Sequence, residues 1–255
     1  MLITLLSDLG LRDPSVAVVK GVLMNYTHSP IIDISHEIKP FFLPQAAYLF
    51  SAAYKNFPPG TCHLLLFDLF SVPVPRLLLS EHNGQYFLSP DNGLLPMALG
   101  EVPGRSYLVY ELKANGSFTG WINAAASVIK MVADNKEPDF PPYQLKTHLI
   151  PDHTVIENKL LCEIIHIDRY ENIILNVTKK QFEKTFQKRP FRLQFMQVEE
   201  INEISDNYND VREGYKLCRF NSNDHLEICI NRGKAASLFG FRLGGNFNDI
   251  KIAAE

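Results

Sequence analysis

Hydrophobic residues in the first half of the chain alternate between short strand-like runs and segments with helical spacing. Residues 2–6 form a leucine-rich run that predicts a strand, and residues 16–23 carry valine and leucine at helical spacing. Asp13 and Pro14 come just before this helix, as an N-cap and a proline at the first helical position. The alternation predicts an α/β domain with a mostly parallel sheet and flanking helices.

The same alternation continues as far as residue 132. It predicts a strand at 30–33, a helix from Pro44 to Ala53, a strand at 62–67 and a last helix at 124–132. Within this stretch, residues 76–79 and 85–88 flank Asn83 and Gly84, a pair that suits the positive φ angles of a type I′ turn. These residues predict a β-hairpin.

The middle of the chain changes in composition. Prolines at positions 138, 141, 142 and 151 break any regular element there, as is typical of an interdomain linker. The runs beyond them are strand-like and lie at 160–167, 173–177, 192–198, 215–220, 225–230 and 249–253. We therefore expect the α/β domain over residues 1–140, a linker over 141–155, and a smaller all-β barrel or sandwich over 156–255.

Bulk properties fit a globular protein and exclude some classes of partner. The 255 residues carry 25 Lys and Arg against 28 Asp and Glu, a formal net charge of -3, so there is no broad basic surface for a nucleic acid. No apolar run approaches the ~20 residues that span a bilayer. The first residues already predict a strand, without the basic segment and cleavage site of a secretory signal. We expect a cytoplasmic protein that binds neither nucleic acid nor membrane.

The four cysteines are Cys62, Cys162, Cys218 and Cys229. Each lies in an apolar strand-like run, and no two form the C-x-x-C pair that is typical of zinc sites or redox chemistry. We predict buried thiols that act as small apolar side chains.

Three aspartates follow predicted strands of the α/β domain: Asp8, Asp33 and Asp68. Ligands of open α/β sheets bind outside the carboxyl ends of the strands, so we expect the three carboxylates to gather at one rim. Taken singly, each could equally be a helix N-cap or a turn residue. Together they form a candidate site that would either bind a divalent metal or accept hydrogen bonds from a ribose diol.

The histidines do not support the metal alternative. His36 and Glu37 are adjacent, so their side chains diverge, and His166 with Asp168 supplies only two groups along one strand. An ionised aspartate only accepts hydrogen bonds, and it can take both hydroxyl protons of a cis-diol. We expect a small nucleoside ligand, with no metal and no other cofactor.

Several segments follow one another in a distinctive order along nearly the whole chain. They are residues 6–10 with Asp13 and Lys20-Gly21, then 33–38, 57–61, 90–95, 167–172, 226–228 and 231–236. The first is similar to a T-D-F-G…D…K-G pattern, and residues 167–172 are similar to I-D-x-F-G-N. In this order the segments resemble the motifs of the S-adenosylmethionine (SAM) hydroxide adenosyltransferase family, which has the fluorinase- and chlorinase-like fold.

The resemblance implies that SAM is the substrate or ligand and that the protein is a homotrimer. The N-terminal domain of one subunit and the C-terminal domain of its neighbour would enclose SAM between them. By position, Asp8 would hold the ribose hydroxyls. The residues implied around methionine and adenine are Asp168, Tyr170, Asn172, Ser222, Ile230 and Arg232.

Two segments depart from the family pattern at the residues thought to activate water, which are an Asp, an Arg and a His. The pattern V-D-P-G-V-G-x-x-R-R falls on residues 67–76, where Asp68 is retained, Pro75 takes the first arginine position and Arg76 matches the second. The pattern F-H-G-R-D falls on residues 118–122, where Thr119 replaces the histidine. A hydroxyl cannot serve as a base near neutral pH, so the candidate catalytic residues are Asp68 and Arg76.

These observations leave two functions of different class. The first is a weak or divergent SAM hydrolase, in which water attacks the ribose C5′ and gives adenosine and L-methionine. The sulfonium is an excellent leaving group, so positioning and desolvation of the water can supply most of the catalysis. The alternative is a non-catalytic homologue that binds SAM or adenosine and has lost the water-activating residues. Halogenation is disfavoured, because nothing in the sequence marks a halide site.

Overall fold

The computed structural model describes residues 1–111, 117–145, 155–156, 159–187, 189–196, 198–244 and 250–254. The chain divides into two compact units, residues 1–150 and 151–255. The first residues of the predicted linker belong to the first unit, because the Leu108 amide donates to the Pro141 carbonyl over 3.0 Å and the Tyr143 amide to the Ser106 carbonyl over 2.8 Å. The remainder of the predicted linker, from residue 146 to residue 154, lies outside the described residues.

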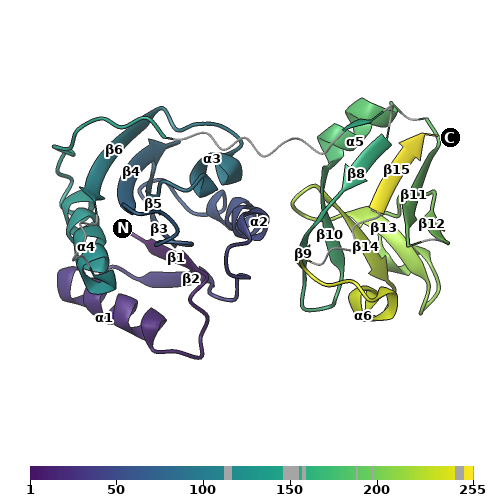
Figure 1. The fold of residues 1–255 in the computed structure, drawn as a ribbon, viewed down its shortest axis with the longest axis horizontal. Coiled ribbons are helices and arrows are strands. Elements are labelled where there is room, and N and C mark those ends of the chain that lie inside the picture. The colour runs from purple at the N-terminus through teal and green to yellow at the C-terminus, as the bar shows by residue number, and fades with distance from the viewer. Residues whose placement is uncertain are drawn as a thin grey trace. The chain divides into compact units, whose positions relative to one another are not determined.

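A six-stranded mixed sheet forms the centre of the first unit (Figure 1). Its order is β2-β1-β3-β5-β4-β6, with bounds β1 Ile3–Ser7, β2 Ile31–Ser35, β3 Cys62–Leu66, β4 Arg76–His82, β5 Gln85–Pro90 and β6 Arg105–Glu111. Strands β2, β1, β3 and β5 run parallel, and β4 is antiparallel to both β5 and β6. The predicted α/β fold is confirmed, and β6 is a strand that the sequence pattern did not predict.

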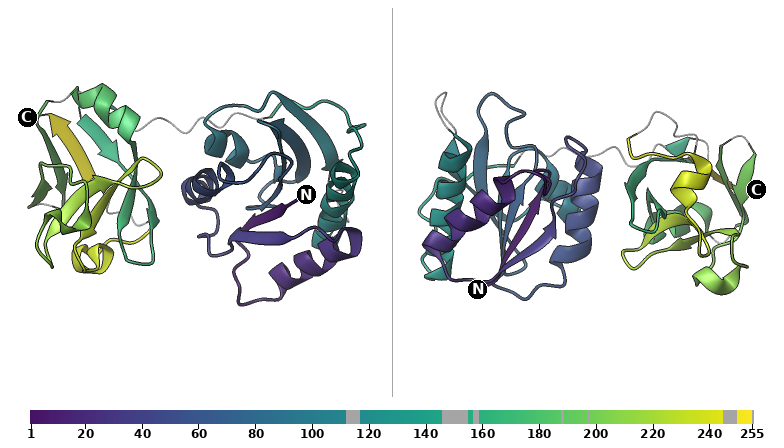
Figure 2. Two further views of the ribbon diagram at one scale, coloured as in Figure 1. Left: turned by 180° about the vertical axis from the view of Figure 1, so that it is seen from behind. Right: turned by 90° about the horizontal axis from the view of Figure 1, so that it is seen from below.

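Helices cover both faces of this sheet (Figure 2). Helices α1 (Ser15–Tyr26) and α4 (Phe118–Ala133) pack on one face, and α2 (Leu43–Tyr54) and α3 (Leu94–Leu99) pack on the other. Successive side chains of a strand point to opposite faces, so Leu5 of β1 packs with α1 and α4 while Leu6 packs with α2 and α3. The strand-rich core holds the carboxyl end of β1 in place.

Two helix starts differ from the predictions. Pro14 occupies the cap position of α1 without a side-chain cap, so the helix begins one residue later and Asp13 is not its N-cap. Helix α4 begins at Phe118 instead of residue 124, because the Ser117 hydroxyl accepts a hydrogen bond from the Gly120 amide over 3.1 Å and caps the first turn.

The predicted hairpin between β4 and β5 is confirmed. Asn83 has a φ of 50° and Gly84 a φ of 73°, as a type I′ turn requires. Helix α3 follows β5 directly and was not predicted, because its 6 residues are too few to show a helical period.

The second unit contains two antiparallel sheets that share one hydrophobic core. One sheet has the order β13-β14-β10-β9 and the other β12-β11-β15-β8-β7. The bounds are β7 Val155–Ile156, β8 Lys159–Cys162, β9 Ile164–Ile167, β10 Ile173–Thr178, β11 Phe191–Phe195, β12 Glu199–Ile201, β13 Lys216–Phe220, β14 His225–Ile230 and β15 Ile250–Ala254. The predicted antiparallel β architecture is confirmed, and closure of the sheets into a barrel stays a prediction.

The predicted strand at 160–167 is in fact two strands that belong to different sheets. Glu163 lies between β8 and β9. Its amide donates to Asn176 Oδ1 over 2.8 Å, and its carbonyl accepts from the Asn176 amide over 3.0 Å. These bonds fix the point at which the chain crosses from one sheet to the other, which an unbroken apolar run does not reveal.

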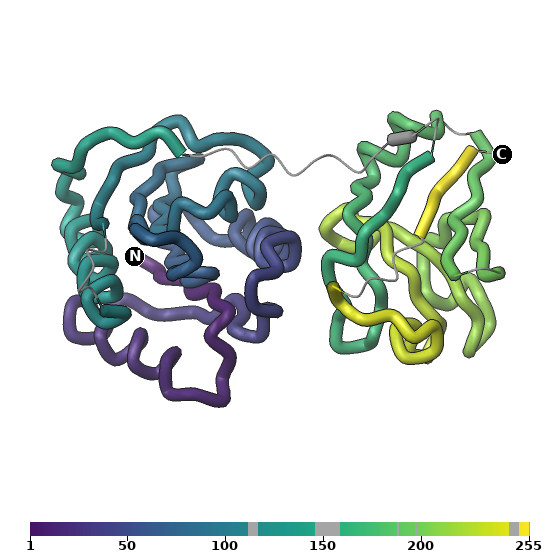
Figure 3. Tube along the Cα trace, viewed as in Figure 1, coloured from purple at the N-terminus to yellow at the C-terminus, as the bar shows by residue number. Residues whose placement is uncertain are grey.

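Short helices lie at both ends of the second unit. Helix α5 (Lys179–Phe186) follows β10 and helix α6 (Ala235–Phe239) follows β14. Because β10 and β14 are antiparallel, the two helices lie at opposite ends of this unit (Figures 1 and 3). A 3-10 turn, η1, spans Tyr208–Asp210.

The cysteine prediction is confirmed, because all four cysteines are buried and free. Burial raises the pKa of the Cys62, Cys162 and Cys218 thiols to about 12. Among the helices in the described ranges, none combines the length and the apolar character that a bilayer crossing needs.

Candidate active site

Asp8 and Asp68 meet at the carboxyl ends of two neighbouring strands. Strands β1 and β3 pair in parallel, with Ser7 opposite Leu66, so the residues that follow them emerge at one rim of the sheet. The Asp68 amide donates a hydrogen bond to Asp8 Oδ2 over 3.2 Å. Asp68 has a left-handed backbone with a φ of 48°, a conformation that aspartate adopts more readily than most side chains. The structure thus brings two of the three predicted aspartates together.

Partial burial dominates the electrostatics of Asp8. Desolvation raises the pKa of its carboxyl, the amides of Asp68 and Asp8 lower it by hydrogen bonding, and the nearby charge of Asp68 raises it again. A carboxylate offers about four lone-pair positions. The two amides therefore leave Asp8 with room for further donors, such as a pair of hydroxyls.

Asp33 lies inside a strand, which corrects the expectation that it follows one. It sits in β2 opposite Leu5 of β1. Its carboxylate binds Lys20 Nζ at 2.6 Å and lies 3.1 Å from His36 Nε2. Burial opposes ionisation of Asp33, but the hydrogen bonds and charges of Lys20 and His36 prevail and lower its pKa. Within the described ranges, no group of three His, Cys, Asp or Glu side chains is arranged to hold a metal ion.

Arg76, at the start of β4, is engaged by two residues that were not predicted from the sequence. Its Nε donates to Glu111 Oε1 over 2.7 Å, and its guanidinium lies 5.9 Å from the centre of the Tyr143 ring. The hydrogen bond to Glu111 raises the pKa of Arg76. Tyr143 in turn donates to Asp91 Oδ2 over 2.7 Å. The motif at 90–95 pointed to Asp91, whereas Tyr143 fell in the predicted linker and carried no signal of its own.

In the second unit, Asp168 organises the turn between β9 and β10. Its Oδ1 accepts hydrogen bonds from the amides of Tyr170 and Asn172, each over 2.8 Å, and its Oδ2 accepts one from Asn172 Nδ2 over 2.9 Å. Asn172 is buried, whereas Tyr170 is 75% exposed. Three residues predicted from the sequence therefore meet in one turn, with the tyrosine ring directed toward solvent.

Hydrogen bonds tie the Asp168 turn to α6, whereas Ser222 lies in a different turn. The Ala236 amide donates to the Glu171 carbonyl over 3.0 Å, and Lys234 Nζ lies 2.9 Å from the Glu171 carboxylate. Ser222 is exposed in the turn after β13. The Lys179 amide, at the start of α5, donates to the Asp224 carbonyl of this turn over 2.7 Å. The structure thus places Ser222 at the α5 end of the second unit and does not bring it to the Asp168 turn.

Ile230 and Arg232 lie at the α6 end. Ile230 is buried, and a Cβ atom added at Gly233 would stand 2.4 Å from its Cγ2, so glycine is required at that position. Arg232 has a left-handed φ of 53°, and its exposed guanidinium lies 3.5 Å from Glu213. The segment therefore presents backbone and the exposed Arg232 guanidinium beside the Asp168 turn.

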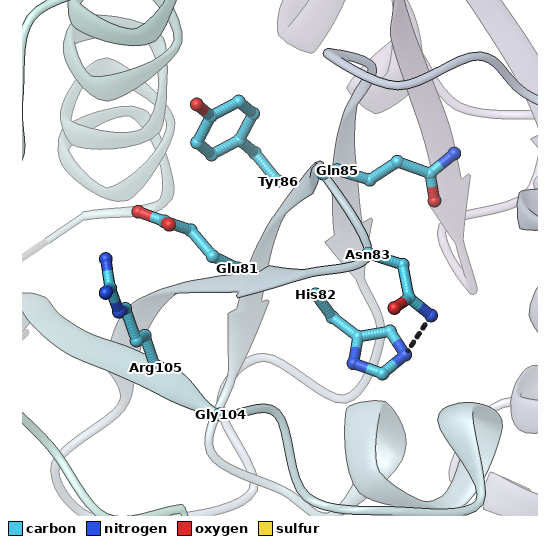
Figure 4. Close-up of a pocket in the computed structure, with 8 residues that line it drawn as sticks. Glu81, His82, Asn83, Gln85, Tyr86, Gly104 and Arg105 are labelled. Carbon is cyan, nitrogen blue, oxygen red and sulfur yellow. Dashed lines mark hydrogen bonds between the residues drawn. The ribbon is translucent and has the colours of Figure 1, made fainter.

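A shallow cavity of about 260 Å³ lies in the first unit, at the β4–β5 turn and the start of β6 (Figure 4). Glu81 and Arg105 line one side of it, and His82 lines another, 2.8 Å from Asn83 Nδ2. Strand β5 runs parallel to β3, so its first residues lie at the edge of the sheet opposite Asp68. None of the predicted site residues lines this cavity.

Two family models match the chain. The model of the SAM hydroxide adenosyltransferase N-terminal domain matches residues 3–125, and the model of the C-terminal domain matches residues 162–248. The chain belongs to the SAM hydroxide adenosyltransferase family. The first match contains the paired Asp8 and Asp68, and the second contains the Asp168 turn.

Two proteins named as SAM hydrolases resemble the chain over most of its length. The protein named (R)-S-adenosyl-L-methionine hydrolase from Thermus thermophilus is 27% identical over an alignment of 254 positions that covers 94% of this chain and 95% of that protein. The protein of the same name from Methanocaldococcus jannaschii is 27% identical over an alignment of 188 positions that covers 71% of this chain and 68% of that protein.

Solved structures show the same fold. An uncharacterized conserved protein from Thermotoga maritima superposes with a TM-score of 0.81 at 24% identity, covering 99% of this chain and 100% of that chain. A conserved hypothetical protein from Thermus thermophilus has a TM-score of 0.74 at 23% identity, covering 100% of this chain and 99% of that one.

Thr119 lies exposed in the first turn of α4. The ring of Phe118 contacts that of Phe70 with 6.4 Å between centroids, so this turn lies beside the loop that follows Asp68. Trp121 points away from the surface and is fully buried in the core shared by α1 and α4. Thr119, where the resemblance to the family predicts a histidine, thus lies beside the loop that follows Asp68.

Proposed function

We propose that the protein hydrolyses SAM to adenosine and L-methionine. The observation that carries this proposal is the pairing of Asp8 with Asp68 at the strand-end rim of a chain that belongs to the SAM hydroxide adenosyltransferase family. The two relatives named (R)-S-adenosyl-L-methionine hydrolase support the same reaction.

In the proposed reaction a water oxygen attacks the ribose C5′ as the bond from C5′ to the sulfonium sulfur breaks. The sulfur keeps the bonding electron pair and leaves as the neutral thioether of methionine, and one water proton is lost to solvent. Asp8 accepts hydrogen bonds from the ribose hydroxyls, and the Asp68 carboxylate orients the water. Since the leaving group is good, holding the water in line supplies a large part of the rate.

A non-catalytic binder of SAM or adenosine is the second candidate, and a specific observation favours it. Thr119 cannot take a proton from water, and Arg76 is already held by Glu111. Both features weaken water activation without touching Asp8.

We also propose that the complete site forms in a homotrimer, between the first unit of one subunit and the second unit of its neighbour. The proposal is supported by the division of the predicted residues, since Asp8 and Asp68 belong to one unit and the Asp168 turn to the other. Light scattering tests it, and a strict monomer in solution would contradict it. We further propose that the C-terminal sheets close into a barrel and that the protein is located in the cytoplasm.

The direct experiment is an incubation of purified protein with SAM, followed by chromatography for adenosine and methionine. We expect slow release of both products, lost in Asp68→Asn and retained in Asp134→Asn, a matched substitution at the exposed end of α4. Tight binding of SAM without product would favour the non-catalytic candidate. Release that is unchanged in Asp68→Asn would point to another site or to a contaminant.

A further inference from the structure

A buried set of contacts lies behind the turn that carries Asp8. Ser7 Oγ lies 2.6 Å from His36 Nδ1, and the two residues are only 0% and 4% exposed. The Leu9 amide donates to Ser7 Oγ over 3.4 Å, and the Gly10 amide donates to the His36 carbonyl over 2.9 Å. The residues on both sides of Asp8 therefore contact His36 or its partner, Ser7 through its side chain and Leu9 and Gly10 through their amides.

The donors and acceptors of this set indicate which atom carries each proton. An amide can only donate, so Ser7 Oγ accepts from Leu9 and has its own proton available for His36 Nδ1. With Nδ1 accepting, the N–H of the ring lies on Nε2, which is buried. Asp33 Oδ1 is the acceptor within reach, at 3.1 Å.

Lys20 completes the set at the surface. Its Nζ lies 2.6 Å from Asp33 Oδ2, and the Lys20 and Asp33 side chains are 31% and 37% exposed. The contacts thus run from a buried hydroxyl through an imidazole and a carboxylate to an exposed cation. They join α1, β2 and the end of β1, and they use residues of two motifs, 20–21 and 33–38, that the proposed reaction leaves without a role.

We propose that Ser7, His36 and Asp33 are positioning residues that hold the Asp8 carboxylate in the orientation that receives the ribose hydroxyls. This inference rests on the proposed function, because it assumes that Asp8 binds a nucleoside. His36 and Ser7 are too deeply buried to touch substrate, so they act only through the Asp8 turn. Their contribution is to the affinity for ribose and not to activation of water.

The consequence is a loss of nucleoside affinity that depends on Asp8. Without the Ser7 hydroxyl or the His36 ring, the turn samples other orientations, and we expect adenosine binding to weaken by roughly tenfold, the order expected when a buried hydrogen bond is lost. Because Asp8 contacts the ribose before and during reaction, KM should rise while kcat stays within about threefold.

The test is a double-mutant cycle that uses adenosine as the probe and calorimetric titration as the readout. Ser7→Ala and His36→Asn are measured alone and in combination with Asp8→Asn. We expect about a tenfold loss in the unmodified background and less than about a twofold further loss in the Asp8→Asn background, where the carboxylate is already gone. Ser7→Thr, which keeps a hydroxyl, should bind adenosine as the unmodified protein does.

Two controls separate positioning from general damage to the fold. His82→Asn replaces a histidine at the opposite edge of the sheet and should leave adenosine affinity unchanged. Asp33→Asn changes the partly exposed carboxylate that contacts His36. The same double-mutant cycle is measured with this variant if a buried variant does not fold.

The outcomes distinguish the two levels of inference. Equal losses in both backgrounds, or no loss in the Ser7 and His36 variants, would overturn the positioning role while the proposed function stands. Failure of the unmodified protein to bind either adenosine or SAM would overturn the proposed function, and the positioning role with it.

Discussion

The Asp68 amide donates a hydrogen bond to the carboxylate of Asp8 across 3.2 Å, although the two residues are 60 positions apart in the chain. The contact uses the side chain of Asp8 but only the backbone of Asp68. Asp8 is held as an acceptor by the backbone of the other loop, whereas the Asp68 side chain takes no part in this bond.

Asp8→Ala is expected to remove most of the affinity for SAM and adenosine. The loss should be about 1.5 to 3 kcal/mol of binding free energy, the range for hydrogen bonds to a charged group. Calorimetric titration measures it. Asp13→Ala, in the same region but outside the pair, is the matched control, and an equal loss in both variants would remove Asp8 from the site.

Thr119→His is expected to accelerate hydrolysis of SAM. It restores the imidazole of the family pattern at an exposed position beside the Asp68 loop, and a positioned general base contributes roughly 10² to 10⁴-fold. Product chromatography under single-turnover conditions measures the rate, with Thr119→Gln as the non-basic control. Vigorous turnover by the unmodified protein would show that another group already activates water.

Asp168→Ala is expected to destabilise the second unit as well as any ligand site there. The substitution leaves the Tyr170 and Asn172 amides and the Asn172 side chain without their acceptor, at a cost of about 1 to 3 kcal/mol in the free energy of unfolding. Urea denaturation measures it. Tyr170→Ala, which removes an exposed ring from the same turn, should change stability by less than about 0.5 kcal/mol.

The free energy of unfolding is expected to decrease as the pH is lowered, because of His63. This ring is fully buried, 2.7 Å from Thr4 Oγ1, and burial lowers its pKa from 6.5 to about 4. Above pH 6.5 the ring is neutral in both states. Between pH 6.5 and 4 only the unfolded chain takes up the proton, so folding loses stability as the pH falls, by roughly 3 kcal/mol in total.

Denaturation at pH 4.5 and pH 7.5 measures the effect of His63. The difference between the two pH values should shrink in His63→Leu, which removes the titrating ring, and should persist in His82→Asn. An unchanged difference in His63→Leu would assign the acid sensitivity to other groups.

Much of the fold was predictable because even short strands stand out in the sequence as apolar runs. The strands around Leu5 and Leu64 and the hairpin at Asn83 follow from local pattern alone. A helix as short as α3 is too short to show a repeating helical pattern, and the crossing at Glu163 is set by a hydrogen bond to Asn176 that a linear pattern does not contain.

The candidate site was predictable only where its residues follow strands or lie in motifs. Asp8 and Asp68 met as expected because parallel strands end at one rim. Tyr143 reached Asp91 from a segment that looked like linker, and Ser222 proved to lie at the far end of its sheet, because tertiary pairing decides both positions.

The left-handed backbone at Asp68 also bears on how the rim could be redesigned. Glycine would satisfy that conformation with less strain, at the price of the carboxylate, while preserving the amide that reaches Asp8. A chain with Asp68→Gly would therefore keep the amide contact with Asp8 and lose the carboxylate that we propose orients the water. Engineers could use such a scaffold to install a different nucleophile-orienting group nearby without rebuilding the loop.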